Sequence, residues 1–192
     1  MKLETISKEY RGYKMLISIH HDEDTGAPWE ENDGHGIVSE WTTRDKQPGE
    51  LVLGSERRSR RYYDFAATLK LARRDGWGLS DNDIAKLAKQ LGRKPTAKQI
   101  LNESVIRDFE YLRGWCQDDW QWLGYTSEIE TPDGETIDGD SCWGFEGTDD
   151  GTKYMIGEAE SHCRSKINSM IEAASKEQSE SHLCACADIA TV

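Results

Sequence analysis

Hydrophobic residues recur at steps of three and four between Thr96 and Leu123, the longest regular pattern in the chain. This spacing puts them on one face of a helix. Thr96 and Gln99 have the spacing of a capping box, which marks the helix start. We therefore predict a long central helix near residues 96–122. Its buried stripe consists of Leu101, Val105, Phe109, Leu112, Cys116 and Trp120.

Shorter patterns flank this helix. Apolar and polar residues alternate over residues 13–21, which predicts a strand. Further strands are predicted, between turn-forming Gly, Pro and Asp residues, over residues 37–42, 50–54, 125–131 and 142–146. Helical spacing returns over residues 62–74, 80–91 and 153–175. The predicted fold class is α+β, with small antiparallel sheet regions packed on three to four helices.

The length of 192 residues suits one domain. We expect residues 1–12 to be a weakly ordered lead-in, 13–175 to be a single α+β domain, and 176–192 to be a mobile C-terminal tail, because neither end shows a pattern. No apolar run reaches the roughly 18 residues that cross a membrane, and the N-terminus lacks a signal-peptide core. The five cysteines show no disulfide framework. A cytosolic protein is the expectation.

Charge is unevenly distributed along the chain. Residues 1–54 hold 6 basic and 11 acidic residues, residues 55–107 hold 13 and 6, and residues 108–192 hold 5 and 19. The middle segment is thus net positive, and the last carries most of the overall charge of −12. Such asymmetry indicates what partners a protein attracts rather than how it folds.

Two opposite surfaces follow from this distribution. Acids in the last segment can imitate a phosphate backbone and occupy a basic groove of another protein; the candidates are Asp118, Asp119, Asp138, Asp140, Asp149 and Asp150. A basic patch over residues 57–98 can contact phosphates directly, because a helix-turn-helix-like arrangement over residues 84–101 carries cations at its second helix start. Its candidates are Arg57, Arg58, Arg60, Arg61, Arg93, Lys94 and Lys98. Either set can also be an ordinary solvated surface.

Metal chemistry has two weaker candidates. His20, His21, Asp33 and His35 bring imidazole and carboxylate groups into one polar region, as a hydrolytic metal site requires, although their spacing matches no metal motif and a plain polar loop explains them too. Cys184 and Cys186 near His182 form a second candidate, but paired Cys-x-x-Cys motifs are absent. No P-loop, nucleophile elbow or dinucleotide fingerprint occurs. The sequence therefore predicts no cofactor and favours binding over catalysis.

Four segments of the sequence together resemble one known group of proteins. Residues 27–41 read Ala-Pro-Trp-Glu-Glu-Asn-Asp-Gly-His-Gly-Ile-Val-Ser-Glu-Trp, and residues 48–51, 62–65 and 74–78 read Pro-Gly-Glu-Leu, Tyr-Tyr-Asp-Phe and Arg-Asp-Gly-Trp-Gly. Together, within residues 13–123, they resemble an uncharacterised group of small proteins encoded by tailed bacteriophages and prophages. The resemblance implies an accessory protein acting in the cytoplasm of a bacterial host. It supplies no catalytic residue.

Three functions are compatible with these observations. The leading one is a phage accessory protein that binds and modulates a host macromolecule through its acidic surface, for example as an anti-CRISPR or anti-restriction inhibitor of a basic nucleic-acid enzyme. The alternative is a nucleic-acid-binding or regulatory module that uses the basic patch. The third is a metal-dependent hydrolase.

Overall fold

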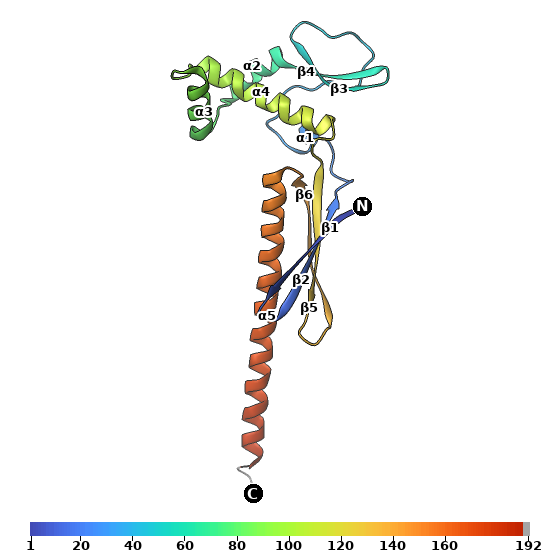
Figure 1. Ribbon diagram of the computed structural model, residues 1–192, viewed down its shortest axis with the longest axis vertical. Coiled ribbons are helices and arrows are strands. Elements are labelled where there is room, and N and C mark those ends of the chain that lie inside the picture. The colour runs from blue at the N-terminus through green and yellow to red at the C-terminus, as the bar shows by residue number, and fades with distance from the viewer. Residues whose placement is uncertain (190–192) are drawn as a thin grey trace. The chain divides into compact units, whose positions relative to one another are not determined.

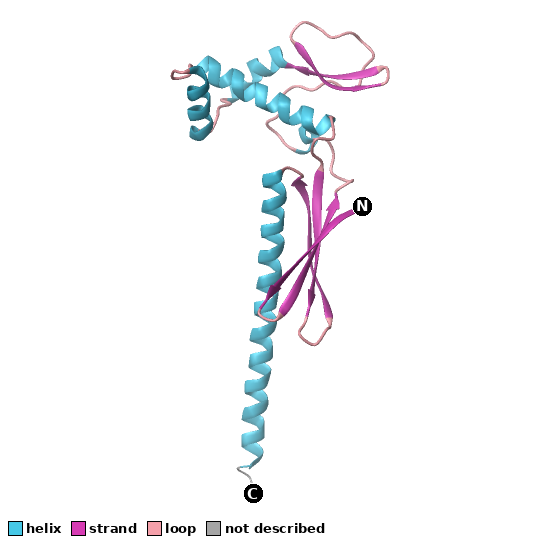
Figure 2. Ribbon diagram, in the orientation of Figure 1, coloured by secondary structure: helices cyan, strands magenta, loops and turns pink. Residues whose placement is uncertain are grey.

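The computed structural model describes residues 1–189, and side chains as far as Lys176. The predicted α+β class is confirmed: antiparallel sheets combine with helices (Figures 1 and 2). The chain forms two compact units. Unit 1 comprises residues 1–24 and the chain from Gln121 onward, and unit 2 comprises Thr25–Trp120. The region predicted as one domain is divided because the chain leaves the sheet of unit 1 after its second strand and returns to it 100 residues later at Gln121.

Unit 1 is a four-stranded antiparallel sheet in the order β1-β2-β5-β6, covered on one face by a single helix. The strands are β1 (Lys2–Tyr10), β2 (Tyr13–His21), β5 (Trp122–Glu130) and β6 (Thr136–Glu146), and the helix is α5 (Asp149–Ile189). One face of the helix buries against the helix-facing residues of β2 and β5. The contact is formed by Met155, Ala159, Cys163 and Ile167 against Met15, Ile17, Ile19, Leu123, Tyr125 and Ile129.

Both ends of the chain differ from the sequence prediction. The expected lead-in over residues 1–12 is instead strand β1, which pairs with β2 across the turn at Arg11 and Gly12. Only Ile6 and Tyr10 of β1 are half-buried, so pairing with β2, not a hydrophobic pattern, determines this strand. The tail expected over residues 176–192 is helical as far as Ile189. The side chains of His182, Cys184 and Cys186 lie outside the described residues.

Unit 2 contains four helices and a two-stranded hairpin, and most of these elements pack around a separate core. Its elements are α1 (Pro28–Glu31), β3 (Glu50–Glu56), β4 (Ser59–Asp64), α2 (Phe65–Asp75), α3 (Asp81–Leu91) and α4 (Ala97–Cys116). The short helix α1 adds one turn. Phe109 and Leu112 are buried, as predicted. The hairpin replaces part of a predicted helix, since residues 62–64 belong to β4 and α2 begins at Phe65.

Helix α4 begins as predicted but ends before residue 122. Thr96 and Gln99 form the capping box, and Gln99 donates its backbone N–H to the Thr96 hydroxyl. The chain turns at Asp118, which has a φ of 59°. Trp120 then folds back, and its Nε1 donates to the Tyr111 carbonyl at 3.0 Å. Trp120 is therefore buried, but not as part of the helical stripe.

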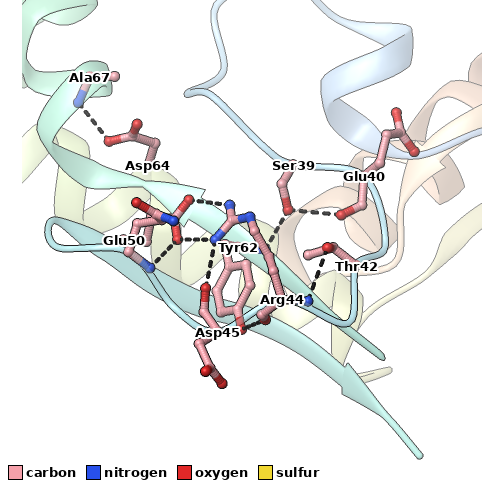
Figure 3. A network of polar contacts seen from close by, with 10 residues as sticks. Ser39, Glu40, Thr42, Arg44, Asp45, Glu50, Tyr62, Asp64 and Ala67 are labelled. Carbon is pink, nitrogen blue, oxygen red and sulfur yellow. Dashed lines mark hydrogen bonds and ion pairs between the residues drawn. The ribbon is translucent and has the colours of Figure 1, made fainter. Parts of the chain in front are cut away.

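The segment before β3 is held by β4 rather than forming a regular strand of its own. Backbone bridges join Val38 to Tyr63 and Thr42 to Arg60. Arg44 then donates two hydrogen bonds to the buried Glu50 carboxylate, and its guanidinium lies 4.7 Å from the ring centre of Tyr62 (Figure 3). These hydrogen bonds lower the pKa of Glu50. The predicted strand over residues 37–42 thus supplies two bridges, and Arg44, which follows it, supplies an ion pair to Glu50.

No helix among the described residues is long and apolar enough to span a membrane.

The core of unit 2 gives a direct test. We expect Leu112→Ala to lower the unfolding free energy of unit 2 by about 2–5 kcal/mol, because it deletes a fully buried side chain from a packed cluster. Ile106→Ala on the same helix removes a side chain that is 41% exposed and should cost under about 0.5 kcal/mol. Hydrogen exchange of the α4 and β3–β4 amides measures both; equal effects would contradict the assigned core face.

Candidate functional site

The carboxylate of Asp108 on α4 organises the glycine-rich loop that the sequence offered as a metal site. His35 Nδ1 lies 2.7 Å from its Oδ1, and Oδ2 accepts hydrogen bonds from the Gly36 backbone N–H at 2.8 Å and the Tyr63 hydroxyl at 2.7 Å. The His35 ring also stacks on Tyr111, with ring centres 5.5 Å apart. Burial and the neighbouring carboxylate raise the pKa of Tyr63. His35 therefore has a structural role, with Asp108 as its partner.

The close packing of this network explains Gly36. A Cβ at this position would lie 2.3 Å from the Tyr63 hydroxyl, which no side chain permits. The sequence contains Asp108 in a helical stretch and His35 in a loop, 73 residues apart. No local pattern connects them, so only the fold reveals the pair.

The other metal candidates are not brought together. His20 and His21 lie on opposite faces of β2, as neighbours in a strand must. His20 Nε2 is 3.0 Å from the Thr126 hydroxyl, and burial lowers the pKa of His20. Asp33 is exposed. Among the described residues, no three His, Cys, Asp or Glu side chains are placed to hold a metal ion.

The predicted basic patch divides into separate places. Arg57 and Arg58 form the turn between β3 and β4, while Arg93 and Lys94 lie between α3 and α4 at the opposite end of unit 2 (Figure 1). Lys98 lies nearby in the first turn of α4, and Arg60 is exposed on β4. These cations cannot contact one phosphate run as a single patch.

Arg61 does not belong to an exposed surface at all. It is only 9% exposed, and its guanidinium lies 4.8 Å from the ring centre of Trp29 and 5.0 Å from that of Trp41. These are cation–π distances. The prediction that Arg61 contacts phosphates is therefore wrong; the side chain joins β4 to two tryptophans. The arginine run hid this role, because strand alternation directs Arg60 and Arg61 to opposite faces.

The six predicted acids are also dispersed. Asp118 and Asp119 follow the end of α4 in unit 2, whereas the other four lie in unit 1. Asp140 turns toward α5, where its Oδ2 is 3.3 Å from His162 Nδ1. Asp149 and Asp150 occupy the first turn of α5. They follow the end of β6, an 11-residue strand, while Asp138 lies near its beginning. The four acids of unit 1 do not form one patch.

His162 has a second neighbour beside a small cavity. The buried Tyr125 hydroxyl lies 2.7 Å from the same Nδ1, and burial raises the pKa of Tyr125 to about 12. The cavity, of about 340 Å³, is lined by β6 and α5, with Asp140, His162, Cys163 and Lys166 among its residues. Burial also raises the pKa of the Cys163 thiol. A raised thiol pKa opposes formation of the thiolate, which is the form in which a cysteine acts as a nucleophile.

A different acidic cluster emerges from the strand pairing. Residues 128–138, the acidic hairpin, join β5 to β6 and hold five acids and no Lys or Arg. Glu128 and Asp138 are directly opposite each other on neighbouring strands. Within the described residues, Glu130 is the one acid of the five in an ion pair, with Lys14 at 3.3 Å. The set is Glu128, Glu130, Asp133, Glu135 and Asp138.

This hairpin continues onto the sheet face that α5 does not cover. Strand alternation places Glu128 on the same face as Thr126 and Gly124, opposite the buried Tyr125 and Ile129. Trp143 lies on this face over Gly124, where a Cβ would approach its ring to 2.1 Å. It is 47% exposed, and its ring centre is 5.8 Å from that of His20. The open face thus carries an exposed indole and an acidic end.

Comparison with protein-family models finds no match for this chain, and comparisons with curated proteins and with solved structures find none either.

The Asp108 network can be tested by substitution. We expect Asp108→Ala to destabilise unit 2 by about 2–4 kcal/mol, because the Tyr63 hydroxyl and the Gly36 N–H lose their acceptor. Asp108→Asn retains one carbonyl oxygen and should recover part of this loss. Glu110→Ala on the same helix, which removes a half-exposed acid paired with Arg113, should cost about 0–1 kcal/mol. Urea unfolding measures all three, and equal losses for Asp108→Ala and Glu110→Ala would refute the role.

Proposed function

We propose that this protein binds a positively charged surface of another macromolecule through unit 1 and modulates that partner. The proposed partner is a nucleic-acid-binding enzyme of a bacterial host, reached in the host cytoplasm. The resemblance to phage-encoded proteins favours an inhibitor of a defence system. A DNA-like or RNA-like charge distribution is what the basic groove of such an enzyme attracts.

The observation that carries the proposal is the separation of charge between the units. Unit 1 holds 20 Asp and Glu against 8 Lys and Arg, while unit 2 holds 16 of each. The whole net charge of −12 therefore belongs to unit 1. Many of its acids have no ion-pair partner among the described residues; these are Glu4, Glu9, Asp24, Glu128, Asp133, Glu135, Asp138, Asp149, Glu158 and Glu172.

Within unit 1, the acidic hairpin concentrates negative charge, with five acids and no Lys or Arg in 11 residues. Like charges directly opposite on neighbouring strands destabilise a sheet, and Glu128 and Asp138 are such a pair. A cationic partner surface removes this repulsion, so the hairpin favours binding to basic groups. Solubility alone requires charge on the surface, but it does not require two acids to face each other when neither carboxylate is in an ion pair among the described residues.

Unit 2 supports direct nucleic-acid binding as a second candidate. Arg93, Lys94 and Lys98 are exposed around the start of α4, where helix N–H groups also attract phosphates. Against this candidate, α4 is 20 residues long and buries much of its length in the unit core. The net charge of unit 2 is also zero. We therefore place the acidic surface first.

The leading proposal predicts a charge-specific interaction. Immobilised protein should capture a nucleic-acid-binding protein from bacterial lysate, and added DNA or RNA should compete for that protein. Reversing Glu128, Asp133, Glu135 and Asp138 to Lys should weaken the complex at least tenfold, mainly through slower association, because steering charges act on the association rate. Surface plasmon resonance with the captured protein measures both rates.

A matched variant controls for the total charge change. Reversing four exposed acids of unit 2, Glu40, Glu56, Asp81 and Glu110, changes the net charge equally and should leave binding within about threefold. If both variants weakened binding equally, the total charge of the protein, and not the hairpin, would explain the effect. The proposal would be refuted if the captured protein bound the hairpin variant as tightly as it binds the wild-type protein.

The second candidate makes an opposite prediction for the isolated protein. If unit 2 binds nucleic acid, a gel shift should appear that weakens steeply with salt and disappears when Arg93, Lys94 and Lys98 become Ala. We expect no shift at micromolar protein. Arg57→Ala with Arg58→Ala tests the hairpin turn separately. Arg61 is left unchanged, because its loss would disturb the packing of Trp29 and Trp41. A salt-sensitive shift abolished by either set would replace the leading proposal.

A further inference from the structure

The two edges of the unit 1 sheet differ in how they are protected. Strand β6 is one edge, and its pairing with β5 is interrupted by two register shifts. Lys166 of α5 also donates to the carbonyls of Asp138 and Gly139. Bulges and a covering lysine are devices that keep an edge strand from pairing with another chain.

Strand β1, the other edge, has a single register shift, between Lys2 and Glu4 near its start, and no side chain of α5 is bonded to its backbone among the described residues. It pairs with β2 without interruption from Glu4 to Tyr10. Among the described residues, no backbone hydrogen bond reaches its outer side. Most of its side chains are exposed. A nine-residue strand with an open edge is a template for another strand.

The turn determines which backbone groups of β1 point outward. Arg11 and Gly12 both have positive φ, as in a two-residue type I′ hairpin. The flanking residues Tyr10 and Tyr13 therefore exchange backbone hydrogen bonds, and so does every second residue before Tyr10. The N–H and C=O groups of Thr5, Ser7 and Glu9 consequently face away from β2.

The sequence of β1 is self-complementary in one antiparallel register. With Ile6 opposite Ile6 of a second copy, Thr5 lies opposite Ser7 and Glu4 lies opposite Lys8, each twice. In this register, the outward N–H and C=O groups of Thr5 lie opposite those of Ser7 in the second copy, so the two residues can exchange backbone hydrogen bonds. A shift by two residues in one direction puts Lys2 opposite Lys8, and a shift in the other puts Ile6 opposite Lys8. Of these three registers, only the one with Ile6 opposite Ile6 pairs Glu4 with Lys8.

Lys8 remains available for this contact. Its ammonium bonds to Glu160 of α5, but that carboxylate also accepts from Arg164 at 3.1 Å. The Lys8 side chain is 43% exposed. It can therefore bind Glu4 of a second copy while keeping its place beside α5.

We propose that two copies of this chain associate through antiparallel pairing of their β1 strands, which joins two four-stranded sheets into one. The occupant of the open edge is a second copy, because one register satisfies the outward backbone groups and also pairs Glu4 with Lys8 twice. The pairing is independent of the acidic-surface proposal, and it doubles the acidic surface that each assembly presents.

Sedimentation equilibrium from micromolar to near-millimolar protein tests the association. We expect a mass approaching twice 21.8 kDa. Ser7→Pro removes an outward N–H without breaking the β1–β2 ladder and should give a monomer with unchanged circular dichroism. Ser7→Ala, which retains the N–H, should remain dimeric. A monomeric wild-type protein at every concentration would overturn the proposal.

Charge exchange tests the register and the identity of the partner. Glu4→Lys places two lysine pairs across the interface, and Lys8→Glu places two glutamate pairs there; each variant alone should dimerise roughly tenfold more weakly. Mixed together, they restore both Glu–Lys pairs and should form a heterodimer. A dimer insensitive to these changes, or a mixture that fails to associate, would show that the interface lies elsewhere.

Discussion

Unit 2 depends on the carboxylate of Asp108, which holds three chain segments together. His35 and Gly36 come from the glycine-rich loop, Tyr63 comes from β4, and Asp108 itself comes from α4. Each donor would be costly to bury alone, since an unsatisfied polar group costs about 1–3 kcal/mol. Because all three converge on one acceptor, the loop cannot move without breaking the packing of β4 on α4. A loop with the composition of a reactive site is thereby fixed as a structural element.

Unit 1 obtains its stability in a different way. Its fully buried side chains form an apolar layer between one sheet face and α5, with Met15, Ile17, Tyr125, Ile129, Met155 and Ile167 among them. Few polar groups take part in this layer. The charged residues on the open face and in the hairpin are therefore not needed for packing. This separation allows unit 1 to carry all the net negative charge at a modest cost, because repulsion between two exposed charges is about 1 kcal/mol in water.

The sequence predicted features that depend on local periodicity and missed those that depend on pairing. The stripe containing Phe109 and Leu112, the Thr96 capping box and the apolar alternation of β2 each lie within one element, so the pattern alone identifies them. The sequence of β1 shows no clear alternation of apolar and polar residues. Most of its side chains are exposed, and the strand is determined by backbone pairing with β2. The partner of His35 is 73 residues away, and Arg61 leaves the basic run because alternation turns it inward. The acidic candidates are dispersed for a similar reason. A register shift in β6 separates Asp138 from Asp140, and a turn separates both from Asp149, although the three are close in sequence.

Charge alone does not make a tight complex. The open face of unit 1 also carries an exposed tryptophan, Trp143, which can supply apolar binding energy. Complementary charges raise the association rate, whereas most binding energy in protein interfaces comes from a few buried aromatic or arginine anchors. Trp143 lies on the face that also carries Glu128 and Asp138, and Gly124 beneath it leaves room for the indole to lie flat against the sheet. Nearly half of the Trp143 side chain is open to solvent. A basic partner steered by the acidic hairpin would therefore find an aromatic anchor on the same surface. This arrangement distinguishes a binding face from a surface that is acidic only for solubility, since solubility gives no reason to expose an indole on the same face as carboxylates that are in no ion pair among the described residues.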